Sequence, residues 1–232
     1  MKIQAFTLAE VLITLGIIGI VASMTMPALV NLTQNKELET QYKQAYSIIS
    51  QALNRLNSEQ GFVANYDNYR ACTDDFAEAY KEYFVKLVDC GKDGCSSSTG
   101  KDEDGKETGL DKYRSFTGNY SAAGWLDDGQ YTVANTMFIA VNHCTPLNKI
   151  TIGVDVNGIN KKPNRFGHDF FLFQIQEDGK LLPMGAPNTT STRWSGDYKN
   201  YCKAGSTNVA NGFTCAYRAM TEKDYFKNLP KS

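Results

Sequence analysis

One long apolar run near the amino terminus constrains this chain more than any other feature. Residues 6–26 read FTLAEVLITLGIIGIVASMTM, and Glu10 is the only ionisable side chain among them. A helix rises about 1.5 Å per residue, so a run of this length crosses a hydrocarbon core of about 30 Å. The sequence therefore predicts a membrane-spanning helix over residues 6–26.

Composition describes the rest of the 232-residue chain as polar and globular. The mean hydropathy of the whole chain is -0.39, so the apolar run is an exception within a polar sequence. The 24 basic and 25 acidic residues nearly cancel, which gives no electrostatic reason to expect nucleic acid as a ligand. The chain has two histidines and no G-x-S-x-G or P-loop pattern. We therefore expect that the protein is not an enzyme and has no catalytic residues.

The flanks of the run differ from those of an ordinary signal peptide. Such a peptide carries small residues after its apolar core, where it is cleaved, whereas here the small residue Ala5 precedes the run. Glu10 lies about one turn inside the run, where an unpaired carboxylate costs roughly 2.5 to 3.5 kcal/mol. A carboxylate kept at that depth indicates a function and a partner that compensates its charge.

The residues around Ala5 and Glu10 resemble the prepilin-type signal of type IV pilins and type II secretion pseudopilins. In that family a short basic leader ends in a small residue, usually glycine, and cleavage exposes a phenylalanine that is then N-methylated. The resemblance implies a leader of residues 1–5, cleavage between Ala5 and Phe6, and N-methylation of Phe6. Glu10 would then be the fifth mature residue, where the family has a glutamate. Pro27 would be the twenty-second, where many members have a proline.

The same resemblance implies a structural subunit. Prepilin peptidase would process the chain. Inner-membrane assembly machinery would then polymerise it with identical or related subunits into a type IV pilus or a type II secretion pseudopilus. Before assembly it would cross the inner (cytoplasmic) membrane once, with its N-terminus inside and its head outside, and afterwards it would lie in a periplasmic or cell-surface filament. The alternative is a minor pilin whose head binds a surface, a secreted substrate or DNA at the fibre tip.

We expect Glu10 and Pro27 to serve assembly. When apolar helices pack side by side, the Glu10 carboxylate can meet the amine of Phe6, its own or a neighbour's, and set the axial register. Removing one member of such a desolvated pair strands the other charge and is strongly destabilising. Pro27 lacks a backbone donor and can kink or open the helix.

Beyond the membrane run, the pattern predicts an amphipathic continuation of the helix over residues 27–60. Apolar side chains recur along it at three and four residues, which indicates one buried stripe, and Gly61 is placed to close the helix.

The remaining residues, 61–232, form the predicted globular head. Its expected elements are a helix over 75–88, strands over 136–142, 149–156, 168–176 and 180–184, and a short helix over 221–227. These elements predict an α+β, pilin-like fold, in which a long N-terminal helix packs on a small antiparallel sheet and a loop-rich C-terminal region contains disulfides.

All six cysteines follow the apolar run, on the side that a pilin exports. In an oxidising compartment an even number of cysteines is typical of disulfides. We favour a Cys202–Cys215 bridge, because it would restrain a loop-rich terminal segment. Local spacing suggests Cys90 with Cys95, which leaves Cys72 with Cys144. Zinc is disfavoured because there is no C-x-x-C pair.

A loop between two predicted strands concentrates oxygen donors in residues 155–169. Asp155, Asn157, Asn164 and Asp169 are hard ligands of the kind that calcium takes, although their spacing does not match an EF-hand. The alternative is that these residues and their glycines are turn formers at strand ends. The sequence leaves both interpretations open.

Overall fold

A computed structural model of the chain describes residues 7–70, 72–91, 109–121, 123–144, 148–190 and 198–230. The architecture is α+β, as predicted, and divides into two compact units, residues 1–37 and 38–232. The long helix α1, Leu8–Gln60, contributes residues to both units.

The first unit is the apolar part of α1. Within the described residues, Leu8–Met26 is one stretch long and apolar enough to cross a membrane, with a mean hydropathy of 2.0. Its large apolar side chains are exposed, among them Leu8 and Ile18. The helix continues through Pro27 without ending there. The predicted end of the helix is confirmed at Gln60, where Gly61 adopts a positive φ of 73° and its N–H donates to the carbonyl oxygen of Asn57 at 3.2 Å.

The second unit is built on a six-stranded antiparallel sheet. Its strands follow one another in chain order, β1 to β6, so the sheet is a simple meander. The strands are β1 Lys86–Gly91, β2 Gly129–Val133, β3 Phe138–Asn142, β4 Ile150–Asp155, β5 Phe170–Ile175 and β6 Leu181–Pro183. Two short α-helices, α2 Asp75–Lys81 and α3 Cys215–Thr221, accompany it. Four 3₁₀ turns complete the unit: η1 Gly109–Lys112, η2 Ala134–Thr136, η3 Tyr198–Tyr201 and η4 Phe226–Asn228.

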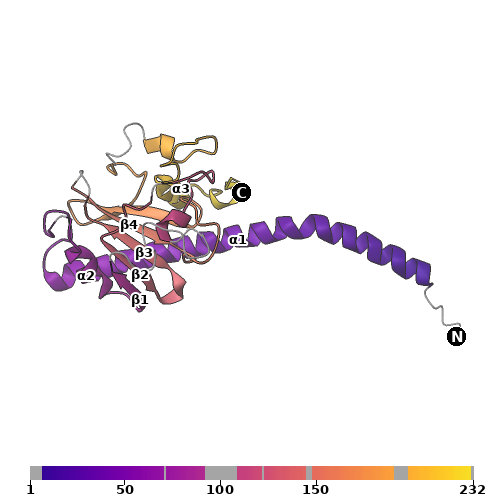
Figure 1. Cartoon of the computed structure of the whole chain (residues 1–232), viewed down its shortest axis with the longest axis horizontal. Coiled ribbons are helices and arrows are strands. Elements are labelled where there is room, and N and C mark those ends of the chain that lie inside the picture. Colours follow the sequence, from indigo (N-terminus) through magenta and orange to yellow (C-terminus); the bar gives the residue numbers. More distant parts are fainter. Residues whose placement is uncertain are drawn as a thin grey trace. The chain divides into compact units, whose positions relative to one another are not determined.

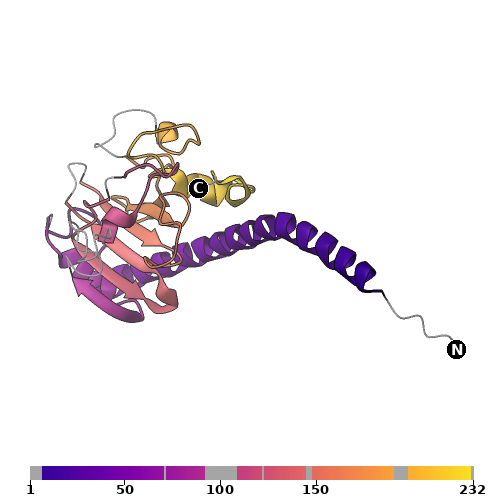
Figure 2. The ribbon, with the colours of Figure 1, turned by 45° about the vertical axis from the view of Figure 1, so that its right-hand side comes forward.

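One face of the sheet packs against α1 from Leu38 onward, as Figures 1 and 2 show. The apolar stripe predicted for this part of the helix is the stripe that is buried. The Tyr42 ring lies 4.5 Å from that of Phe171 on β5, and its hydroxyl donates to the carbonyl oxygen of Ala216 on α3 at 2.6 Å. These contacts join α1, the sheet and the C-terminal segment in one core.

The opposite face of the sheet carries a second apolar cluster. Alternate residues of each strand point to opposite faces, so Phe138 and Ala140 of β3 belong to this cluster while Ile139 and Val141 face α1. Loop residues cover it, and the rings of Tyr113 and Phe170 stack at 4.2 Å. This cluster supports the loop between β4 and β5.

Two disulfides between described residues connect the loops of this unit. Cys72 is bonded to Cys144 just after β3, and Cys202 is bonded to Cys215 at the start of α3. Both of these predicted pairings are thereby confirmed. Cys90 is also disulfide-bonded, but Cys95 lies outside the described residues.

The structure corrects two of the expected helices and adds two strands. The helix expected over 75–88 ends at Lys81, and Lys86–Gly91 instead pairs with β2 as an edge strand. The helix expected over 221–227 is replaced by α3, which ends at Thr221, and by η4. The four expected strands correspond to β3–β6, each with shorter bounds. In the first case, pairing of residues 86–91 with a distant strand, β2, overrides the local helical spacing.

Candidate functional site

Glu10 has a hydrogen-bond partner in Thr7, the residue just before its helix. The backbone N–H and the hydroxyl of Thr7 both donate to Glu10 Oε2, each at 2.8 Å. In return, the Glu10 N–H donates to Thr7 Oγ1 at 3.2 Å. This reciprocal arrangement is a capping box, in which a threonine at the helix start and a glutamate three residues later satisfy each other's backbone donors.

The capping box gives Glu10 a local structural role at the start of its helix. A carboxylate at a helix N-terminus also meets the positive end of the helix dipole, so its charge is compensated locally. The sequence analysis overlooked Thr7, although the T-x-x-E spacing of Thr7–Glu10 is a known signal for a helix start. Ala5 and Phe6, the expected cleavage and methylation site, lie outside the described residues.

The four candidate calcium ligands, Asp155, Asn157, Asn164 and Asp169, lie in and at the ends of the loop between β4 and β5. Asp155 Oδ1 accepts the backbone N–H groups of Asn157 and Gly158, at 3.2 and 2.9 Å. The Asp169 carboxylate accepts the N–H groups of Asn164 and Arg165, each at 2.7 Å. The loop backbone therefore donates hydrogen bonds to both carboxylates. This supports the interpretation of Asp155 and Asp169 as turn formers.

Burial gives these two carboxylates unusual electrostatics. Both side chains are fully buried, and this raises the pKa of Asp155 to about 7. Burial also raises the pKa of Asp169 well above its usual value, and the nearby negative charge of Asp155 raises it further. The pair is therefore costly to ionise together.

Tyr113 is a third member of this site that sequence reasoning missed. Its hydroxyl donates to Asp155 Oδ2 at 2.6 Å, and its ring is fully buried. Tyr113 follows η1 and is far from the loop in sequence, so no local pattern connects the two. Only the packing of η1 on the sheet brings them together.

The amides of Asn157 and Asn164 complete the loop. Asn157 Nδ2 donates to the carbonyl oxygen of Lys162 at 3.2 Å, and Asn164 Nδ2 donates to that of Ile159 at 3.3 Å. The side-chain oxygens of both residues are buried and accept no hydrogen bond. Within the described residues no group of three or more histidine, cysteine, aspartate or glutamate side chains is placed to hold a metal, so any ion here needs these amide oxygens as well.

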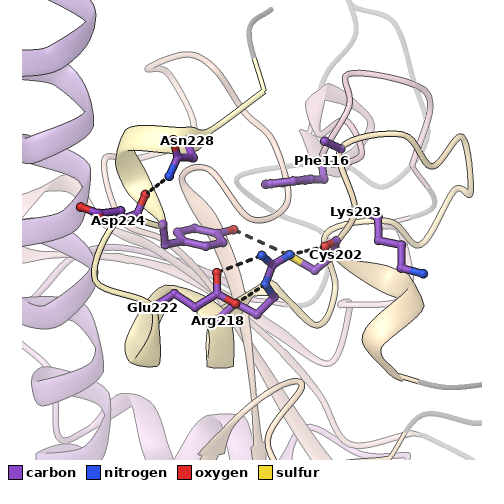
Figure 3. A pocket seen from close by; sticks show the side chains of 9 residues that line it. Phe116, Cys202, Lys203, Arg218, Glu222, Asp224 and Asn228 are labelled. Atoms are coloured by element: carbon purple, nitrogen blue, oxygen red, sulfur yellow. Dashed lines mark hydrogen bonds and ion pairs between the residues drawn. The ribbon is translucent and has the colours of Figure 1, made fainter.

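A separate cavity of about 370 Å³ lies between the C-terminal segment and the loop that contains Phe116 (Figure 3). Arg218 donates to both carboxylate oxygens of Glu222, at 2.6 and 2.9 Å, and to the carbonyl oxygen of Cys202 at 2.5 Å. Asp224 accepts from the ammonium of Lys227 at 2.7 Å. These charged groups neutralise one another, and we assign no reaction to the cavity.

Comparisons with known proteins add no relative. No protein-family model matches the chain, and neither a curated protein nor a solved structure matches it.

Proposed function

We propose that the chain is a membrane-anchored structural subunit of the type IV pilin or type II secretion pseudopilin kind, which polymerises through its apolar helix after its leader is removed. The observation that carries the proposal is the stretch Leu8–Met26, which is apolar, exposed and interrupted by one carboxylate, Glu10. An exposed apolar stretch of this length requires lipid or other apolar helices around it.

The core of the second unit is consistent with a separate anchoring and assembly role for the apolar stretch. Its core takes residues from Leu38 onward and none from the apolar stretch. The stretch is thus available for a bilayer before assembly and for neighbouring helices in a filament afterwards. In this proposal the head is the exported part, and its disulfides suit an oxidising compartment.

Glu10 has two roles in the proposal. Both hydrogen bonds from Thr7 reach Oε2 and fix the side chain at the helix start. The carboxylate then receives the amine of a Phe6, and this charge pair sets the axial register between subunits. The local cap pre-organises Glu10, so less conformational entropy is lost when the pair forms.

Two substitutions of Glu10 separate these roles. Glu10→Gln keeps an acceptor for the Thr7 cap but removes the charge, whereas Glu10→Ala removes both. We expect both variants to be absent from filaments sheared from cells, while immunoblots of the membrane fraction still detect the folded, disulfide-bonded chain. Thr7→Ala, which keeps the charge and loses only the hydroxyl part of the cap, is the matched control and should retain incorporation.

Normal incorporation of Glu10→Gln would overturn the charge-pair argument and leave Glu10 with a capping role only. The charged groups Arg218, Glu222 and Asp224 around the cavity in Figure 3 bond to neighbouring protein groups, so this cavity gives no support to the fibre-tip alternative.

A further inference from the structure

Two neighbouring segments of the second unit form a basic patch. Three of its cations lie in the loop between β4 and β5, and the other two lie in η1 and just after it. Arg114 and Arg165 pair in a parallel bridge, in which the Arg114 N–H donates to the carbonyl oxygen of Asn164 at 2.8 Å. Side chains of residues paired in this way project from the same face of their two segments. The patch consists of Lys112, Arg114, Lys161, Lys162 and Arg165.

Most of the patch has no ion-pair partner among the described residues, since its three lysines and Arg165 take part in no ion pair there. Arg165 Nη1 is also buried without a hydrogen-bond partner, and a Cβ added to Gly118 would lie 2.8 Å from Arg165 Nη2. The patch therefore keeps a positive charge that the protein neutralises at other positions. Cations of the second unit that do bond to a carboxylate are Lys43, Arg70, Lys81, Lys149, Lys180, Arg218 and Lys227.

The carboxylates near the patch in sequence do little to neutralise it. Residues 156–168 contain no aspartate or glutamate, and residues 109–121 contain one, Asp111. Asp155 and Asp169 flank the loop between β4 and β5, but both are fully buried and accept backbone N–H groups of that loop. Burial raises the pKa of both, which reduces their negative charge. The described residues here therefore present a positive surface, in a chain whose formal net charge is -1.

The patch belongs to the end of the sheet at which the second unit begins. This unit starts at Leu38, and one turn later the Tyr42 ring lies 4.5 Å from that of Phe171, near the start of β5. The turn after β5 lies at the other end of the sheet, where Asn65, beyond the end of α1, donates from Nδ2 to the carbonyl oxygen of Glu177 at 2.9 Å. β5 therefore runs in the same direction as α1, so the loop that precedes β5 lies at the Leu38 end.

That end of the second unit is close to the apolar stretch along the chain. Residues 27–37 separate Leu8–Met26 from the second unit, and a helix of that length measures about 17 Å. Lipid headgroups extend about 5 to 8 Å beyond the hydrocarbon core on each side. Charges interact across about 8 Å at physiological ionic strength. The connecting segment is therefore short enough for the patch to meet the headgroups.

We propose that the basic patch binds the phosphate groups of an anionic phospholipid surface while Leu8–Met26 anchors the chain in the same membrane. Guanidinium and ammonium groups both donate to phosphate oxygens, and anionic lipids attract clusters of lysine and arginine close to a bilayer. Free phosphate offers the same chemistry, but a lipid surface presents many phosphates to several cations at once. This inference rests on the membrane anchoring in the proposed function, and it is independent of leader removal and filament assembly.

The test uses the full chain in nanodiscs of phosphatidylcholine alone or of phosphatidylcholine mixed with anionic phosphatidylglycerol. Lysines are acetylated briefly with a water-soluble reagent and quantified by peptide mass spectrometry. Lys161 and Lys162, which are exposed, should react several-fold more slowly in the anionic discs, and high salt should remove this protection. Lys180, in the turn at the other end of the sheet, is the internal control and should react equally in both discs.

A pair of variants tests the role of charge. Replacing Lys161 and Lys162 together by glutamine should remove most of the protection of Lys112 in anionic discs, because fewer cations then hold the patch to the surface. Lys180→Gln is the matched control and should leave the protection of Lys112 unchanged. The replaced side chains are exposed, so both variants should retain the disulfides Cys72–Cys144 and Cys202–Cys215.

Three outcomes would overturn the inference. Equal acetylation of Lys161 and Lys162 in the two discs, with the chain inserted in both, would exclude lipid binding and leave the anchoring proposal intact. Equal protection in neutral discs by inorganic phosphate or by a short DNA duplex would assign the patch to a soluble anion or to nucleic acid. A chain that enters neither disc would contradict the anchoring itself, and this inference with it.

Discussion

At the scale of single residues, the same side chain often serves both local folding and a possible function. Glu10 was first interpreted as an assembly residue because a carboxylate in an apolar run is costly, yet it also caps its own helix through Thr7. Asp155 and Asp169 were interpreted as calcium ligands or turn formers, and their bonds to backbone N–H groups support the second role without removing the first. Residue type alone did not separate these roles, because the local hydrogen bonds decide them.

A substitution of Gly158 would measure how closely the loop after β4 is packed. Its φ is +90°, and a Cβ there would lie 2.2 Å from the carbonyl oxygen of Thr136. Gly158→Ala should therefore lower the free energy of unfolding by about 2 to 5 kcal/mol in urea titrations of the chain in detergent. Gly205→Ala is the control, because nothing lies within 4 Å of its Cβ position. Equal stability of the two variants would show that the loop relaxes around the added methyl group.

His143 predicts a pH dependence of stability. Burial lowers its pKa below the ordinary 6.5, against smaller opposing effects of the Tyr66 carbonyl, Asp128 and Asp75. At a pH between this lowered pKa and 6.5, the His143 side chain is protonated in the unfolded chain but neutral in the folded chain. The free energy of unfolding should therefore fall as the pH drops from 6.5 through the lowered pKa.

The measurement compares urea unfolding of the unsubstituted chain and of His143→Gln at about pH 7.5 and about pH 5. The variant should lose less stability on acidification. Burial also lowers the pKa of His168, to about 4, but that residue and the buried carboxylates are common to both chains and do not affect the difference. An identical pH dependence in the two chains would contradict the burial argument.

At the scale of elements, strongly periodic segments were predictable and pairings between distant segments were not. The stripe from Leu38 to Leu56 and the helix end at Gln60 follow from apolar spacing and from Gly61. The meander β3–β6 follows from β-rich runs divided by turns. β1 was missed because, among the described strands, it pairs with β2 alone, and that pairing is broken by two register shifts. Tyr113 was missed for a similar reason, since its contact with Asp155 depends on tertiary packing.

The C-terminal segment provides a prediction at this scale. The Cys202–Cys215 bridge closes a loop of 13 residues in sequence separation, within a region of few regular elements. Replacing both cysteines by serine should lower the free energy of unfolding by about 3 kcal/mol, mainly through the added entropy of the unfolded chain. Urea titration under oxidising conditions measures this. An unchanged unfolding midpoint would mean that packing of Ala216 and Tyr225 restrains the segment without the bridge.

At the scale of the whole molecule, the uneven distribution of apolar residues is the central feature. The apolar side chains of Leu8–Met26 are exposed, whereas those from Leu38 onward form the core of the second unit. This separation underlies the proposal of an anchoring and assembly helix joined to an exported head. The proposal requires that residues 1–5 are removed, because only then does the amine of Phe6 exist to meet Glu10.

Intact-mass and N-terminal peptide mass spectrometry of the chain, isolated from membrane and filament fractions, tests this claim most directly. We predict a chain that begins at Phe6, lacks residues 1–5 and carries one additional methyl group on its amine. A chain that still begins at Met1 in both fractions would contradict it.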